Sequence, residues 1–179
     1  MADTVKTRAA SILALALAIP AMGFALGLFV GVAAEPMFST ADLDPPDTRT
    51  TATAFARNNG ALGWSLMVIG FLTYGLGSAA LLALNGFLTG QLLRALVVDQ
   101  RLDAVATGLA PHAFVEVGGL VACAGAGVLF VHALLRRVVL HSAIGPRLPL
   151  AAAVTAAGGF LLIAVAALIE ASWSTVALS

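Results

Sequence analysis

The stretch PHAFVEVGGLVACAGAGVLF, residues 111–130, decides how this chain folds. It is a long apolar run that begins with a histidine and a glutamate, His112 and Glu116, four residues apart. At this spacing the two side chains share one face of a helix, with Cβ atoms about 5–6 Å apart. Ionisable groups in an apolar span are costly and are commonly functional. This pair is therefore the first candidate site.

The composition is that of an integral membrane protein. Of the 179 residues, 60% are hydrophobic and 10% are charged, and the mean hydropathy is +1.01, which is too apolar for a water-soluble domain of this length. The formal net charge of zero leaves no basic surface to neutralise phosphates, so we expect no nucleic acid as a partner. The single Cys123 cannot form an internal disulfide.

The apolar segments predict an all-α integral membrane bundle of about five transmembrane helices, forming a single transmembrane domain over residues 1–179. The helices are expected near 9–34, 60–75, 78–97, 111–133 and 150–170. Charged residues and prolines predict an external aqueous loop at 35–58. A turn at Tyr74–Ser78 would divide residues 60–97 into two helices. The alternative, one tilted helix, would reverse the direction of the two that follow.

The distribution of basic residues predicts the orientation. With five spans, one side carries the larger group: Lys6, Arg8, Arg136, Arg137 and Arg147. The other side carries Arg49, Arg57 and Arg101. The positive-inside rule then places the N-terminus in the cytoplasm and the C-terminus outside. A cleaved signal peptide ending at Val32-Ala33-Ala34 is the alternative for the first segment, although its apolar run is longer than usual.

Small residues mark helix faces that are suited to close packing. Gly23, Gly27, Gly31 and Glu35 recur every four residues, which predicts a packing groove that ends in a carboxylate. In the third predicted helix, Ser78, Asn85 and Thr89 form a polar stripe that should face the bundle.

The predicted topology brings polar groups at the outer helix ends toward His112 and Glu116. We expect a polar cluster whose other members are Glu35, Asn59, Asn85, Arg94 and Glu170. Glu116 would lie about 6 Å deeper than His112. One interpretation is a proton- or cation-responsive site, or a general acid–base pair that acts on a substrate among the helices. The other is a structural clamp, with the pair hydrogen-bonded to Asn85 or Arg94.

The motifs of cofactor-dependent and soluble enzymes are not present in the sequence. The zincin His-Glu-x-x-His pattern is missing, and His132 and His141 fall near the opposite side from His112, so we expect no metal and no other cofactor. No nucleophile elbow, Walker loop or dinucleotide fingerprint occurs. We therefore do not expect the chain to be an enzyme on its own.

Four motifs in order resemble the stage II sporulation protein M family: RNNGALG at 57–63, LNGFLTG at 84–90, APHAFVEVGG at 110–119 and LIEAS at 168–172. The resemblance covers roughly Phe55 to Ser172. Matched to the family pattern, it singles out Asn59, Asn85, Gly86, Gly90, Pro111, His112, Glu116 and Glu170. The chain departs from the pattern at Ala113, where the family commonly has glycine, and this puts a close backbone contact in doubt.

The resemblance implies a multi-pass protein of the bacterial cell membrane. It suggests a scaffold or subunit of a membrane complex, of a peptidoglycan-remodelling or a transport and export type. One alternative is the membrane subunit of an enzyme that matures a hydrophobic peptide, with His112 and Glu116 as an acid–base pair. Another is a proton-coupled carrier. The expected partners are membrane lipid, another membrane protein or a second copy of the chain, and a hydrophobic peptide substrate.

Overall fold

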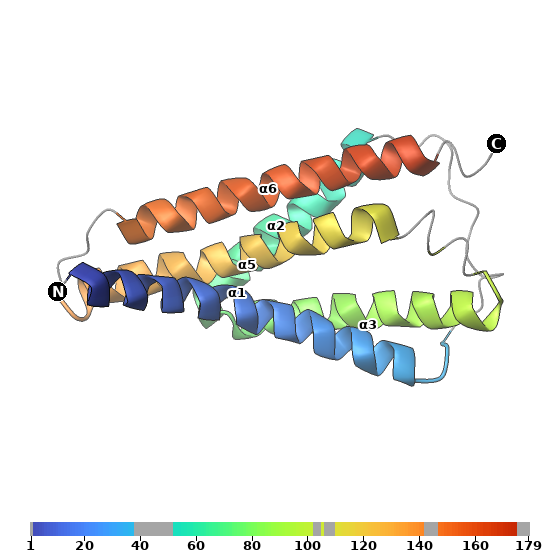
Figure 1. The fold of residues 1–179 in the computed structure, drawn as a ribbon, viewed down its shortest axis with the longest axis horizontal. Helices are drawn as coiled ribbons and strands as arrows, with labels where there is room; N and C mark the ends of the chain where they lie inside the picture. Colours follow the sequence, from blue (N-terminus) through green and yellow to red (C-terminus); the bar gives the residue numbers. More distant parts are fainter. Residues whose placement is uncertain (1, 38–51, 102–104, 106–109, 142–146, 175–179) are drawn as a thin grey trace.

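The computed structural model describes residues 2–37, 52–101, 105, 110–141 and 147–174, and its long elements are all α-helices. They are α1 (Ala2–Ala33), α2 (Ala52–Thr73), α3 (Leu76–Val98), α5 (Ala110–Val138) and α6 (Arg147–Ser174). Successive helices run in alternate directions along the long axis, so the chain starts at one end of the bundle and finishes at the other (Figure 1). The predicted all-α membrane bundle is confirmed.

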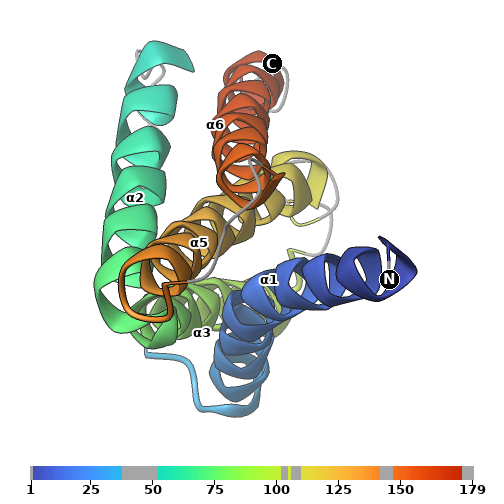
Figure 2. The same ribbon diagram turned by 90° about the vertical axis from the view of Figure 1, so that its left-hand side faces the viewer.

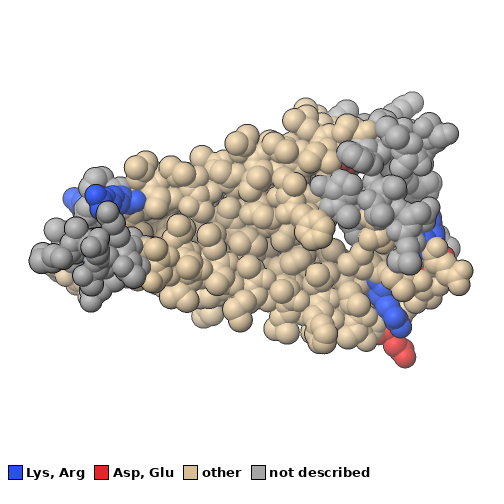
Figure 3. Space-filling model, viewed as in Figure 1, with Lys and Arg blue, Asp and Glu red and all other residues tan. Residues whose placement is uncertain are grey.

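Four of these helices are long and apolar enough to cross a membrane. The spans are Ala10–Ala33, Leu76–Val98, His112–Val138 and Arg147–Ser172. The remaining helix, α2, carries Arg57, Asn58 and Asn59 in its first half, which lowers its hydropathy. On the face shown in Figure 3, charged side chains lie at the two ends of the described surface, and none is seen in the band between them. A membrane fits this band. Because α1 and α3 run through it in the same direction, the chain has to return through α2, so the five predicted crossings are kept although α2 is less apolar than the other four helices (Figure 1).

A tight turn separates α2 from α3, so residues 60–97 form two helices rather than one. Tyr74 and Gly75 both have positive φ, 54° and 93°, in the left-handed region that glycine adopts without strain. The phenol of Tyr74 is hydrogen-bonded to the ring of His132 on α5. This contact ties the turn to the neighbouring helix.

Helices α1 and α3 pack with their backbones in contact. A Cβ atom added to Gly23, Gly27 or Gly31 would overlap a backbone carbonyl of α3. In return, a Cβ atom on Gly86 or Gly90 would overlap a backbone carbonyl of α1. The predicted glycine groove is therefore the α1–α3 interface, as is usual for small-residue stripes in membrane helices.

The buried side chain of Gln91 adds polar contacts to the α1–α3 interface. Its Nε2 donates to the carbonyl oxygen of Gly31 at 2.8 Å, and its Oε1 accepts from the backbone N–H of Met37 at 2.7 Å. Gln91 is fully buried, and both partners belong to α1 or the segment directly after it. The end of α1 is thus held against α3 by hydrogen bonds as well as by packing.

Helix α5 lies at the centre of the bundle, between α2 and α6 on one side and α1 and α3 on the other (Figure 2). The core it forms with α2 and α6 includes Leu66, Leu120, Cys123 and Ile163. The first half of α1 also packs on α5, where Ala16 lies against Gly125. Helix α3, by contrast, makes few contacts with α5.

Candidate functional site

Three side chains of residue types that can bind a metal ion meet near the start of α5 and the end of α6. They are His112, Glu116 and Glu170, and we call them the His–Glu–Glu cluster. One ligand atom from each residue lies within 4.8 Å of the other two. His112 is 9% exposed, and both glutamates are partly buried. Ring atom Nδ1 of His112 has no hydrogen-bond partner in the described part of the chain, although the residue is not without other interactions.

The register between α5 and α6 explains why these residues meet. Gly119 lies against the backbone of Ile163, where a Cβ on the glycine would be 3.1 Å from the isoleucine N atom. His112 is two helical turns before Gly119, and Glu170 is two turns after Ile163. Because the helices are antiparallel, equal distances from this contact bring the histidine and Glu170 to the same level.

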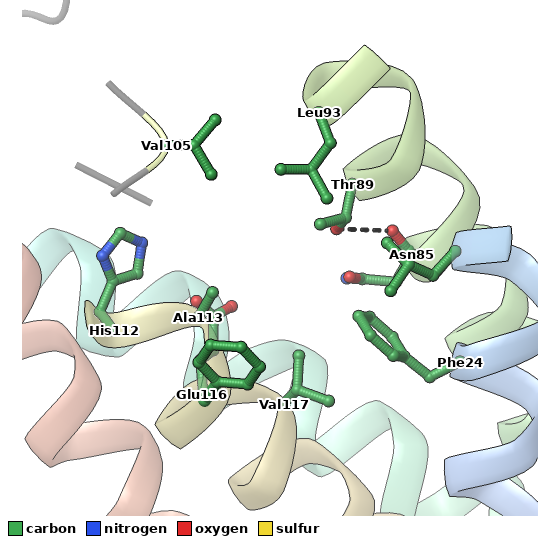
Figure 4. Close-up of a pocket in the computed structure, with 11 residues that line it drawn as sticks. Phe24, Asn85, Thr89, Leu93, Val105, His112, Ala113, Glu116 and Val117 are labelled. Carbon is green, nitrogen blue, oxygen red and sulfur yellow. Dashed lines mark hydrogen bonds between the residues drawn. The ribbon is translucent and has the colours of Figure 1, made fainter. Parts of the chain in front are cut away.

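A cavity of about 340 Å³ lies beside the cluster. Apolar side chains from three helices line most of it, with Phe24 and Leu28 on α1 and Leu93 on α3. His112 and Glu116 belong to both the cavity wall and the cluster, and they lie across the cavity from α3 (Figure 4). Since α3 and α5 make few contacts, the cavity occupies the space between them.

The wall opposite His112 carries two further polar residues, Asn85 and Thr89. The Thr89 hydroxyl donates to the backbone carbonyl of Asn85 at 2.9 Å, within its own helix. The side-chain amide of Asn85 faces the cavity (Figure 4). The predicted polar stripe on α3 therefore places an amide opposite the histidine–glutamate pair.

The other three members of the predicted polar cluster do not line the cavity. Asn59 on α2 is buried, 8% exposed, and its Oδ1 accepts a hydrogen bond from the Nδ2 of Asn58 at 3.3 Å. Glu35 and Arg94 are exposed side chains, and neither lines the cavity. Of the five residues expected around the pair, the structure brings Glu170 into the cluster and Asn85 into the cavity wall.

Sequence reasoning missed Gln91, the most buried of the long polar side chains described. The signal was present, because Gln91 directly follows Gly90 on a helix whose packing face is marked by Gly86 and Gly90. A polar side chain next to a glycine contact face is well placed to reach the partner backbone. Its hydrogen bonds to α1 assign it a structural role.

These features define a helical membrane protein with a His–Glu–Glu cluster beside an apolar cavity. The family model described as Stage II sporulation protein M matches residues 14–175. The chain therefore belongs to the stage II sporulation protein M family, and the resemblance seen in the sequence is confirmed. No curated protein and no solved structure matches the chain.

Proposed function

We propose that this protein is the membrane subunit of a complex that binds a hydrophobic peptide segment within the bilayer and acts on it through His112 and Glu116. The observation that carries the proposal is the shared wall: both residues line a largely apolar cavity. An apolar cavity with a few converging polar groups is the usual form of a ligand or active site. A cluster that served only to clamp helices would not need to border such a space.

The mixture of groups in the cavity favours a peptide over a lipid chain. Peptide amides in a hydrocarbon environment need hydrogen-bond partners, since water is not available there. The amide of Asn85 can both donate and accept, and it lies opposite His112 and Glu116. Phe24, Leu28 and Leu93 would contact apolar side chains of the same segment. An acyl chain has no polar group that could form a hydrogen bond with the Asn85 amide.

A histidine and a glutamate on one wall suit proton exchange with a bound peptide. A general acid or base must lie within hydrogen-bond reach of the proton that it transfers. Both side chains border the same cavity, and so both can approach one peptide bond or side chain. With the N-terminus cytoplasmic, as the basic residues predict, this end of the bundle faces outward.

A photo-crosslinking experiment tests the binding step. A photoreactive amino acid replaces Leu93 in the cavity wall, and the matched control replaces Leu161, an exposed position on α6 that is 65% accessible. We expect a peptide to be captured from native membranes at position 93 and lipid alone at position 161. Capture of lipid alone at both positions would reject the proposal. His112→Gln and Glu116→Gln should preserve capture but stop conversion of the captured peptide.

A scaffold function is the second candidate, and the exposed face of α1 supports it. Met22, Leu26 and Phe29 are 70%, 64% and 72% exposed, on the least buried of the four spans. This face can bind either lipid or a helix of a partner protein. Purification from the native membrane in a mild detergent distinguishes a lipid-covered face from a partner-binding face, because a scaffold should co-purify with a defined membrane protein. Recovery of a stable chain without any partner argues against it.

A proton-coupled carrier is the remaining alternative, favoured by the two acidic side chains that lie together on α5 and α6. Carriers commonly place such groups inside the bundle. Reconstituted vesicles should then show solute flux that depends on a pH gradient. Absence of such flux, together with peptide capture at position 93, would favour the peptide-binding function.

A further inference from the structure

We propose that His112, Glu116 and Glu170 bind a divalent transition-metal ion, with Zn²⁺ as the first candidate. The set offers one imidazole nitrogen and two carboxylate oxygens, all within 4.8 Å of one another. Zinc is bound by such atoms at about 2.0–2.2 Å, which places ligands of a tetrahedral site about 3.4 Å apart. Small side-chain rotations therefore suffice to close the set around an ion.

The charge of the cluster also points to a cation. Two carboxylates lie side by side at the end of apolar spans, where unneutralised charge is costly. In the described part of the chain, neither Glu116 nor Glu170 forms an ion pair with a lysine or an arginine. A single divalent ion would neutralise both carboxylates and supply each with a strong partner.

The backbone around the cluster is suited to hold a ligand set in place. Between the Gly119–Ile163 contact and the cluster, α6 presents two buried alanines, Ala166 and Ala167, toward its neighbours. Small residues here keep α5 and α6 close, so that side chains from both helices reach one point. Rigid elements of this kind favour a defined coordination geometry.

The types of ligand narrow the choice of metal. Mg²⁺ and Ca²⁺ prefer sites made only of oxygen ligands, whereas a histidine with two carboxylates suits Zn²⁺, Fe²⁺ or Mn²⁺. Three protein ligands leave a fourth position open, as in catalytic zinc sites. Because His112 and Glu116 also line the cavity, the open position is accessible to water or to a carbonyl oxygen of a bound segment.

Glu170 is the reason that the structure points to a metal site where the sequence did not. The sequence presented one His–Glu pair at ligand spacing, which is too few ligands for a site. The third ligand comes from a different helix. This inference goes beyond the proposed function, and the peptide-binding step does not rest on it, since the cavity can bind a peptide whether or not the cluster holds an ion. Metal ligation by His112 and Glu116 is an alternative to direct proton exchange by the same two side chains.

Metal titration of the full-length protein tests the inference. The protein in detergent is stripped with a chelator and titrated with ZnCl₂, and bound metal is measured by elemental analysis. We expect one Zn²⁺ per chain, and a loss of at least about ten-fold in affinity in each of His112→Gln, Glu116→Gln and Glu170→Gln. Glu35→Gln and His141→Asn change exposed residues of the same types outside the cluster, and should bind as the unaltered protein does.

Titration with CoCl₂ gives a second readout, because Co²⁺ held by these ligands absorbs visible light in a way that reports its coordination geometry. We expect the visible absorption bands of bound Co²⁺ in the unaltered protein and in Glu35→Gln, and no such bands in Glu170→Gln. Failure of the unaltered protein to retain either metal would overturn the inference and leave protons to neutralise the carboxylates. Retention of full affinity by Glu170→Gln would overturn it equally.

A variant that fails to assemble is recognised by its size-exclusion profile. In that case thermal unfolding of the unaltered protein and of Glu35→Gln decides the question: ZnCl₂ should raise both midpoints, since a ligand that binds only the folded state stabilises it. No rise would count against the site. Crosslinking at position 93 is scored independently, so loss of the metal site and loss of peptide binding can be told apart.

Discussion

Gly119 of α5 and Gly159 of α6 face each other with almost no space between their backbones. A Cβ atom on Gly119 would lie 2.8 Å from the carbonyl oxygen of Gly159, and one on Gly159 would lie 2.9 Å from that of Gly119. This contact fixes the separation of the two helices that carry the His–Glu–Glu cluster. Packing at the glycines and geometry at the cluster are therefore linked.

Gly159→Ala should destabilise the protein by about 1–3 kcal/mol, the usual range for overpacking in a tight interface. The added methyl would meet both the backbone of Gly119 and the Cys123 sulfur, which is 2.8 Å away. Gly158→Ala is the matched control, because a Cβ there has nothing within 4 Å and alanine is the better helix former. Thermal unfolding in detergent measures both. Equal midpoints for the two variants would contradict the close contact.

Gly27→Ala should separate α1 from α3 and lower stability by a similar amount. Its methyl would overlap the carbonyl group of Ala83, which belongs to rigid helix backbone and cannot turn away. Gly60→Ala is the control, since a Cβ at that helical position meets no atom within 4 Å. Loss of stability in both variants alike would show that alanine itself is harmful, irrespective of the interface.

Gln91→Leu should cost about 1–3 kcal/mol of stability, because it leaves the carbonyl of Gly31 and the N–H of Met37 without their partner. The control, Ser65→Ala, removes an exposed hydrogen bond to Ala61 within one helix and should change little. Denaturant titration followed by fluorescence compares them. A fully stable Gln91→Leu protein would mean that water or lipid headgroups satisfy the freed groups.

Labelling of an introduced cysteine tests the orientation predicted from the basic residues. Met37→Cys places a reactive thiol at an exposed position just after α1, and Leu140→Cys places one just after α5. These two helices end at opposite ends of the bundle (Figure 1). The native Cys123 is buried and supplies an unreactive background. In intact cells a membrane-impermeant maleimide should label position 37 and spare position 140. The reverse pattern would place the N-terminus outside.

The all-helical membrane bundle could be predicted because hydropathy and helix-breaking residues are local signals, although α2 begins at Ala52, inside the segment that was expected to be an external loop. The break between α2 and α3, for example, lies at Tyr74 and Gly75, inside the stretch where glycines favour a turn. Membership of the cluster was harder to predict. The depth of a residue in the membrane follows from the rise per residue of its helix. By depth alone, Glu35 and Arg94 were candidates for the cluster. Whether a side chain points inward depends on how each helix is rotated, and both of these are exposed.

Glu170 illustrates the same point from the other side. Its distance from His112 depends on the register between α5 and α6, and that register is set by Gly119, Ile163 and the small residues around them. A pattern within one helix does not encode this register. Gln91 was not predicted because its position is fixed by the glycine contact between α1 and α3, and not by its closeness to a helix end.

The α1–α3 interface is made of backbone, and this makes it tolerant of some changes and intolerant of others. Substitutions among the large residues on the outer face of α1, such as Leu26 or Phe29, leave the contact unaltered. A deletion of one residue between Gly23 and Gly31 is different, because it turns every later residue of α1 by about 100° around the helix. The glycines beyond the deletion would then face away from α3. Over evolutionary time, the length of this segment should be more strictly maintained than the identity of its lipid-facing side chains.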